Sequence, residues 1–156
     1  MRDTQTKPPE RYWHYFIDLE GHLWHDGAEI DDPQILRLFL KGMKQRPDGH
    51  YEALCQGEHC LITAEDVPHV IRDLKISPHQ IDLVFPGNFS MPLDPATLFV
   101  GQHNVLYCKI MDGKFMARFS RTAYLDIAKR IEYDQKQFYL TVDKKRYPIQ
   151  GVEPNS

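Results

Sequence analysis

Hydrophobic and polar positions along the chain repeat in one order: two short strands joined by a turn, then a helix. In the first unit, residues 12–17 form an apolar strand, and Glu20 and Gly21 form a tight turn before a second strand. Asp32 followed by Pro33 is typical of a helix start, because aspartate caps free backbone N–H groups and proline has none to satisfy. The helix is expected to bury a broad apolar face made of Ile35, Leu36, Leu38, Phe39, Leu40 and Met43.

The second unit predicts a hairpin with strands 51–55 and 60–63 and a turn centred on Gly57 and Glu58. A helix is expected next, because Thr63 and Asp66 have the spacing of a capping box. Pro68 fits this helix only within its first turn. The apolar stripe of the helix is predicted to consist of Val67, Val70, Ile71 and Leu74.

The third unit begins with the strongest hairpin signal in the chain, Asp112-Gly113, which favours the positive φ angles of a type I′ turn. Ser120 is a good cap for the helix that follows. A last hairpin is expected to turn at Asp143 and Lys144. The third helix is predicted to bury Ala123, Tyr124, Ile127, Ala128 and Ile131.

Residues 81–100 look like a degenerate copy of the unit, with a turn at Pro86-Gly87-Asn88 and a short helix starting at Asp94-Pro95. The turn glycines at 21, 57, 87 and 113 are 36, 30 and 26 residues apart, which is too irregular for a solenoid. The predicted fold class is therefore α+β, with repeated hairpin–helix motifs around mostly antiparallel sheet. One domain is expected over residues 12–150, with 12–76 and 81–150 as candidate lobes. Residues 1–11 are predicted to be a flexible lead-in, and 151–156 a tail.

Composition narrows the class of function. With 156 residues, 42% hydrophobic and 12% aromatic, the chain has the make-up of an ordinary globular domain. A net charge of −3 gives no basic face for phosphates, so no nucleic-acid partner is expected. No apolar run approaches the roughly 18 residues that span a bilayer, so no membrane partner is expected either. The polar N-terminus and an odd count of 3 cysteines favour reduced thiols and a cytoplasmic location.

The segment CQGEHC, residues 55–60, gathers two thiols and an imidazole within six positions. A turn at Gly57-Glu58 would place Cys55 opposite Cys60, a little too far apart for a relaxed disulfide. Two thiolates and His59 could hold zinc, but Cys-x₃-His-Cys is not a standard ligand spacing. The sequence favours a structural turn with no metal and no cofactor. The alternative is a metal- or thiol-dependent enzyme centred on Cys55, His59 and Cys60.

Charged residues gather at the predicted junctions of turn and helix. Glu65 and Asp66 could act as acid and base, although helix capping is the simpler interpretation. Arg118 and Arg121 could hold an anion at a helix start, or pair with carboxylates of a neighbouring unit. No phosphate loop and no nucleophile motif is present, so a binding module is favoured over an enzyme. The predicted contacts to an unknown small ligand or protein partner are Glu58, Glu65, Asp66, Arg118 and Arg121, and a homodimer through a sheet edge is an alternative.

Several short motifs, in their order and spacing, resemble an uncharacterised family called domain of unknown function 4505, also uncharacterised protein family 0598. The resemblance covers residues 12–148 and implies no known reaction; eukaryotic members look mitochondrial, whereas this chain reads as a cytosolic version. His59 and Cys60 depart from the family pattern, so the resemblance does not imply a metal site. The matching residues are Tyr15, Phe16, Ile17, Asp18, Gly21, Leu23, Phe39, Gly49, His50, Tyr51, Glu52, Cys55, Glu58, Glu65, Asp66, Pro68, Pro92, Leu93, Asp94, Pro95 and Leu98.

A weaker similarity is to domain of unknown function 1285. The shared features are an opening Asp-Gly-x-Trp-like hairpin, an Asp-Gly-x-Tyr step and a Glu-Asp-x-Pro helix start. This resemblance implies repeated motifs in two lobes and a role in signalling.

Overall fold

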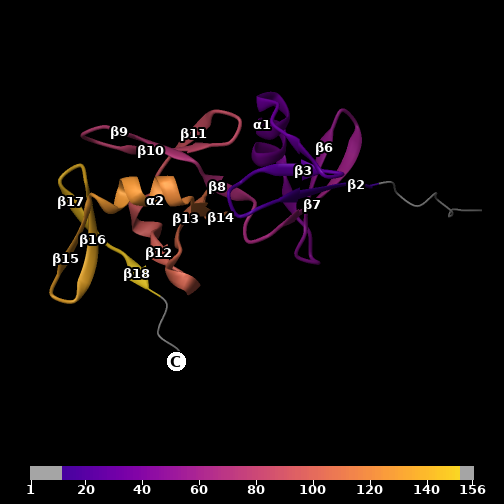
Figure 1. The fold of residues 1–156 in the computed structure, drawn as a ribbon. Coiled ribbons are helices and arrows are strands. Elements are labelled where there is room, and N and C mark those ends of the chain that lie inside the picture. Colours follow the sequence, from indigo (N-terminus) through magenta and orange to yellow (C-terminus); the bar gives the residue numbers. More distant parts are fainter. Residues whose placement is uncertain (1–11, 152–156) are drawn as a thin grey trace, which may run out of the picture.

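The computed structural model describes residues 12–151, so the predicted lead-in 1–11 and the tail residues 152–156 lie outside the described part. Figure 1 shows two groups of elements side by side. We call residues 12–64 the N-terminal half and residues 69–151 the C-terminal half. Buried side chains from both halves form one continuous core, from Ile17 and Leu23 to Leu140 and Ile149.

The N-terminal half is a six-stranded sheet in the order β4-β3-β2-β7-β6-β5, with helix α1 packed on β6. Neighbouring strands are antiparallel except β2 and β7, which run parallel. The elements are β2 (Tyr12–Ile17), β3 (Leu23–His25), β4 (Ala28–Ile30), α1 (Pro33–Gly42), β5 (Lys44–Gln45), β6 (Tyr51–Cys55) and β7 (Glu58–Ala64).

The C-terminal half contains a five-stranded sheet, β18-β12-β13-β14-β8, and two three-stranded sheets, β11-β10-β9 and β15-β16-β17. Two pairs are parallel, β8 with β14 and β12 with β18. The elements are β8 (His69–Ile71), β9 (Asp73–Ile76), β10 (Ile81–Phe85), β11 (Phe89–Pro92), η1 (Pro95–Thr97), β12 (Phe99–Val100), η2 (Gln102–Asn104), β13 (Leu106–Ile110), β14 (Phe115–Phe119), α2 (Arg121–Ala128), β15 (Ile131–Asp134), β16 (Gln137–Val142), β17 (Lys145–Pro148) and β18 (Gln150–Gly151).

The α+β class and the mostly antiparallel pairing are confirmed, and so are two predicted helix starts. The Asp32 side chain accepts a hydrogen bond from the backbone N–H of Gln34 at 2.8 Å, with Pro33 in the first turn of α1. The Ser120 hydroxyl accepts from the N–H of Ala123 at 3.2 Å at the start of α2. Both starts depend on residues adjacent in sequence, which is why the sequence could predict them.

The helix predicted after the second hairpin is wrong, because this segment forms strands β8 and β9. Strand β7 continues to Ala64, so Thr63 lies inside a strand and cannot cap a helix. Val70 and Ile71 are fully buried in β8, which pairs in parallel with β14. An apolar run buried on both faces is typical of such a parallel strand. The repeated hairpin–helix motif is therefore not shown by this structure.

The turn of the CQGEHC hairpin is shifted by one residue from the prediction. Gln56 and Gly57 occupy the turn, with φ angles of 53° and 80°, and Cys55 pairs with Glu58. Cys60 consequently pairs with Ala53 rather than with Cys55. The prediction at Asp112-Gly113 is correct in place, but the loop there has four residues, since Ile110 pairs with Phe115.

Residues 77–80, between the two candidate lobes, form the turn of the β9–β10 hairpin. Arg72 lies between β8 and β9, and its backbone N–H donates to the carbonyl of Val84 on β10 at 2.8 Å. Figure 1 shows β8 beside the N-terminal half.

Candidate functional site

Two of the five predicted ligand contacts lie apart from the rest. Glu58 begins β7 and accepts a hydrogen bond from the indole N–H of Trp13 at 2.9 Å. Glu65 lies seven positions further along the chain, a distance of about 23 Å at the usual rise of a strand. Arg121 is exposed in the first turn of α2 and has no side-chain partner among residues 12–151.

Asp66 and Arg118 do come together, and Tyr107 joins them. One carboxylate oxygen of Asp66, Oδ2, accepts from Arg118 Nη1 and from the Tyr107 hydroxyl, both at 2.6 Å. We call these three residues the Asp66 clamp. The clamp ties linker 65–68 to the five-stranded sheet, as predicted for an arginine paired with a neighbouring carboxylate. Tyr107 belongs to no motif that the sequence analysis singled out, and its pKa is raised by burial and by its bond to Asp66.

Glu65 supports the same junction from the side of the N-terminal half. Its Oε1 accepts from the backbone N–H of Leu19 at 3.3 Å, and its own N–H donates to the carbonyl of Ile17 at 2.8 Å. Glu65 and the Asp66 clamp border a cavity of about 440 Å³ that also includes His103. The charged atoms of the clamp are already paired with one another, so we infer that these residues mainly stabilise the junction between the two halves.

The thiols of CQGEHC do not meet the imidazole beside them. Cys55, Ala53 and Cys60 share one face of the hairpin, whereas His59 pairs with Leu54 and points to the other face. Burial raises the pKa of the Cys60 thiol, and it raises that of Cys108 to about 12. Residues 12–151 hold no cluster of three or more metal-ligating side chains.

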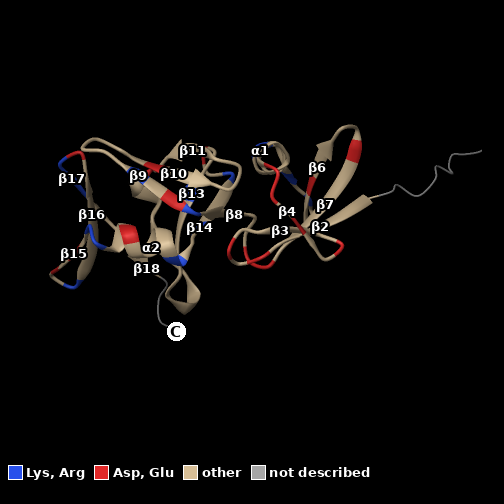
Figure 2. Ribbon diagram, turned by 45° about the horizontal axis from the view of Figure 1, so that its top comes forward, with Lys and Arg blue, Asp and Glu red and all other residues tan. Residues whose placement is uncertain are grey.

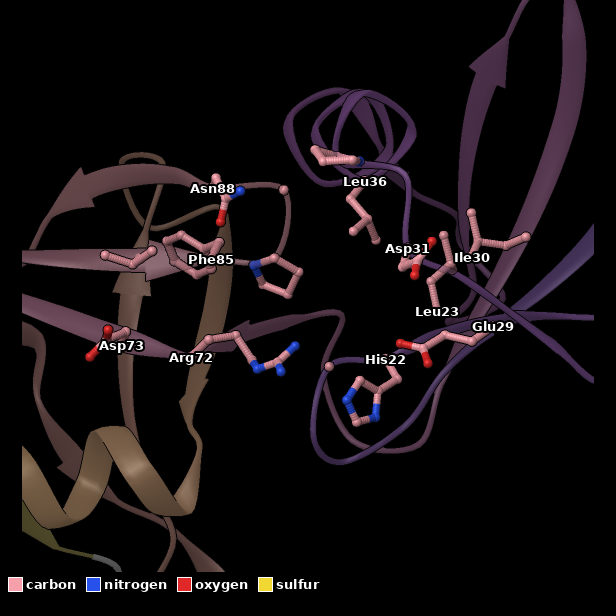
Figure 3. Close-up of a pocket in the computed structure, with 15 residues that line it drawn as sticks. His22, Leu23, Glu29, Ile30, Asp31, Leu36, Arg72, Asp73, Phe85 and Asn88 are labelled. Carbon is pink, nitrogen blue, oxygen red and sulfur yellow. The ribbon is translucent and has the colours of Figure 1, made fainter.

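A second cavity, of about 380 Å³, lies between the two halves. Figure 3 shows side chains reaching into it from β3, β4 and α1 on one side and from the β8–β11 segment on the other. We call it the Arg72 cleft. Its principal lining residues are His22, Glu29, Asp31, Leu36, Arg72 and Phe85.

Two glycines with positive φ bring the halves together at the borders of this cleft. Gly21, with φ of 87°, lies so near β8 that a Cβ there would be 2.9 Å from Val70 Cβ. Gly87, with φ of 93°, lies against α1, where an added Cβ would be 3.0 Å from the backbone nitrogen of Arg37. The Arg37 guanidinium donates to the carbonyl of Gly87 at 2.6 Å. These contacts fix the spacing of the two walls.

Asp18 holds the wall segment that carries His22. Its carboxylate accepts from the N–H groups of Glu20 and His22 and from the Trp24 indole, each at 2.9 Å. Burial acts to raise the pKa of Asp18, but the hydrogen bonds from Trp24, His22 and Glu20 outweigh it, so its pKa lies below the ordinary value. The β2–β3 turn is thus rigid where it borders the cleft.

Arg72 is the cation of the cleft, and its guanidinium points toward His22 and Glu29 in Figure 3. Within residues 12–151 its side chain has no hydrogen-bond or ion-pair partner, and the same holds for Glu29 and Asp31 across the cleft. Figure 2 shows acidic ribbon on the loops of the N-terminal half beside β3 and β4. Unpaired charges of both signs therefore line one cavity, an arrangement suited to binding a polar ligand.

No sequence pattern indicates this site. Its polar residues lie between positions 22 and 88 and become neighbours only through the fold. His22, Glu29, Asp31 and Arg72 belong to no recognisable motif.

No protein-family model matches the chain, and no curated protein matches it either. The fold does match crystal structures. A DUF1285 family protein from Silicibacter pomeroyi DSS-3 has a TM-score of 0.67 and 16% sequence identity, over 92% of this chain and 84% of that one. A DUF1285 family protein from Shewanella baltica OS155 has a TM-score of 0.58 and 16% identity, over 74% of this chain and 90% of that one.

This chain has the fold of DUF1285 family proteins. The weaker of the two resemblances read from the sequence agrees with that fold. The resemblance to domain of unknown function 4505 finds no support, since no family model matches. The motifs behind that resemblance are short, so their order alone is a weak basis for assigning the chain to a family. Among the helices of residues 12–151, none is long and apolar enough to span a bilayer.

Proposed function

We propose that this protein is a binding module that holds a small polar ligand in the Arg72 cleft. The observation that carries the proposal is the Arg72 guanidinium, which faces Glu29 and Asp31 across the cavity with no partner of its own among residues 12–151. Arg72 is exposed, and its planar fork of N–H donors is open to a carboxylate or another anionic group that enters the cleft.

In this proposal the Asp66 clamp braces the junction, and the ligand contacts come from the cleft. Ligand contact by the originally predicted set, Glu58, Glu65, Asp66, Arg118 and Arg121, stays a prediction. So do a protein partner, a homodimer, a signalling role, a cytoplasmic location and the division into two lobes.

The test is a thermal-shift screen of a metabolite panel containing amino acids, organic acids, sugar phosphates and nucleotides. It compares the wild type with Arg72→Ala and with Arg130→Ala, which removes an exposed arginine outside the cleft. At least one compound is expected to raise the Tm of the wild type and of Arg130→Ala by about 2 °C or more. The same compound should leave the Tm of Arg72→Ala unchanged. Compounds that stabilise all three proteins equally, or no stabilising compound at all, would contradict the proposal.

A further inference from the structure

We infer that the Arg72 cleft selects a small zwitterion with an apolar body, of which an α-amino acid with an apolar side chain is the simplest example. Its carboxylate would lie on Arg72, and its ammonium group on Glu29 and Asp31. The inference rests on the proposed function and adds the chemical class of the ligand.

The guanidinium side of the cleft is held by the backbone. Arg72 is anchored by the bond from its N–H to the carbonyl of Val84, so its side chain starts from a fixed point on the C-terminal half. The neighbouring Asp73 forms no ion pair with Arg72 among residues 12–151; its Oδ1 accepts from the N–H of Leu74 at 2.8 Å. In Figure 3 the Asp73 carboxylate points away from the Arg72 guanidinium. The planar fork of arginine matches a carboxylate, to which it can donate two parallel hydrogen bonds.

The acidic side comes from the N-terminal half. Glu29 belongs to β4, and Asp31 follows two residues later, so both carboxylates lie on the stretch of chain that leads into α1. Neither has an ion-pair partner in the part of the chain that the structure describes. Two carboxylates beside each other repel, and an ammonium group with three donors relieves that repulsion while it forms hydrogen bonds. His22 lies on the same side of the cleft, and its Nδ1 is 3.3 Å from Asp18 Oδ2.

Between these charges the lining is partly apolar. Ile30 and Leu36 face the cleft from the N-terminal half, and both are partly exposed. Leu23 and Phe85 also line the cleft but are each only 1% exposed, so the apolar surface open to a ligand comes mainly from Ile30 and Leu36. A cavity of about 380 Å³ is near the small end of the range for ligand sites, which suits a single amino acid or a short peptide.

The pairing of opposite charges favours a ligand that carries both a carboxylate and an ammonium group over one that carries a single charged group. A plain carboxylic acid would satisfy Arg72 but would leave two carboxylates near its own negative charge. A plain amine would satisfy Glu29 and Asp31 but would leave Arg72 unpaired. A ligand with both groups contacts both walls at once, so it gains charge-assisted hydrogen bonds at each wall where a half-ligand gains them at one wall only.

The experiment uses matched sets of three compounds that share one apolar body. The first set is L-phenylalanine, 3-phenylpropionate and 2-phenylethylamine; the second is L-leucine, 4-methylpentanoate and 3-methylbutylamine. Isothermal titration calorimetry at neutral pH and low ionic strength measures each Kd. In at least one set, the amino acid is expected to bind about tenfold tighter than either partner compound, a difference of about 1.4 kcal/mol.

Variants test whether the ligand carboxylate binds Arg72 and whether the ligand ammonium group binds Glu29 and Asp31. Arg72→Ala should lower the affinity for the amino acid to that of the amine and leave the amine unaffected. Glu29→Gln combined with Asp31→Asn should lower it to that of the acid. Arg130→Ala should bind all compounds like the wild type, and circular dichroism of each variant checks that it is folded.

The outcomes separate this inference from the proposed function. If the acid or the amine binds as tightly as the amino acid, or if neither amino acid binds while another panel compound depends on Arg72, the ligand class is wrong and the binding function stands. If no compound in either experiment depends on Arg72, both fail.

Discussion

At the scale of single residues, His69 is the least ordinary side chain of the molecule. It is fully buried, and its Nε2–H donates to the carbonyl of Leu40 in α1 at 2.7 Å. Nδ1 has no partner, and the ring lies against Phe85 and Phe115. Burial lowers the pKa of His69 below its ordinary 6.5, and the bond to Leu40 opposes that shift only in part. The imidazole of His69 is therefore neutral in the folded protein at neutral pH.

Because His69 is buried and neutral, we expect the folded protein to lose stability in acid. Below pH 6.5 the unfolded chain takes up a proton at His69 that the folded chain does not. The free energy of unfolding should therefore fall, as the pH drops toward the lowered pKa, by up to about 1.4 kcal/mol per pH unit from this group. His69→Gln keeps a donor for Leu40 but cannot titrate, so it should flatten this slope even if it lowers overall stability.

Urea unfolding of both proteins at several pH values between neutral and mildly acidic measures the slope. His14→Gln is the matched control, because His14 is exposed and its side chain has no hydrogen-bond or ion-pair partner among residues 12–151. Equal slopes in the wild type and His69→Gln would show that His69 does not carry the effect.

At the scale of elements, the contact between the β2–β3 turn and β8 decides how the halves meet. Gly21→Ala should be costly, because alanine at a φ of 87° is strained and its Cβ would lie 2.9 Å from Val70 Cβ. We expect a loss of about 2–4 kcal/mol in the free energy of unfolding. Gly27→Ala is the control, since Gly27 has a similar φ of 81° with nothing within 4 Å.

The difference between the two variants isolates the packing of β8 against the turn. Chemical denaturation measures both, and the control should cost only the backbone strain of about 1 kcal/mol. Equal losses for Gly21→Ala and Gly27→Ala would mean that the close approach to Val70 contributes nothing.

The helix starts could be predicted from local sequence, whereas strand β8 could not. The starts of α1 and α2 follow from Asp32 and Ser120, whose side chains act on amides two or three residues away. The apolar stripe of residues 67–74 fits a helix and a buried strand about equally well. Its pairing with β14, roughly 50 residues further on, selected the strand. Short apolar runs are ambiguous for this reason, because their partner is not local.

At the scale of the whole molecule, the Asp66 clamp is the charged link between linker and C-terminal sheet. The side chains of Arg118 and Asp66 are only 19% and 29% exposed, so water screens their 2.6 Å bond less than it would a surface pair. Removing either partner leaves the other charge partly buried and unpaired.

A double-mutant cycle tests this link. Asp66→Ala and Arg118→Ala should each lower the free energy of unfolding by about 1–3 kcal/mol. The double variant should lose about as much as one single variant, which gives a coupling energy of about 1 kcal/mol or more. Strictly additive losses in urea unfolding would show that the two residues do not act together.

The sequence by itself determined the fold class, the capped helix starts, most turn positions and the pairing of an arginine with a carboxylate. These depend on residue chemistry and on neighbours a few positions apart. Only the tertiary structure decided that residues 69–76 are strands, that His59 faces away from the thiols, and that Arg72 faces Glu29 and Asp31. Those outcomes depend on strand register and on contacts between distant segments, whose energies no local pattern encodes.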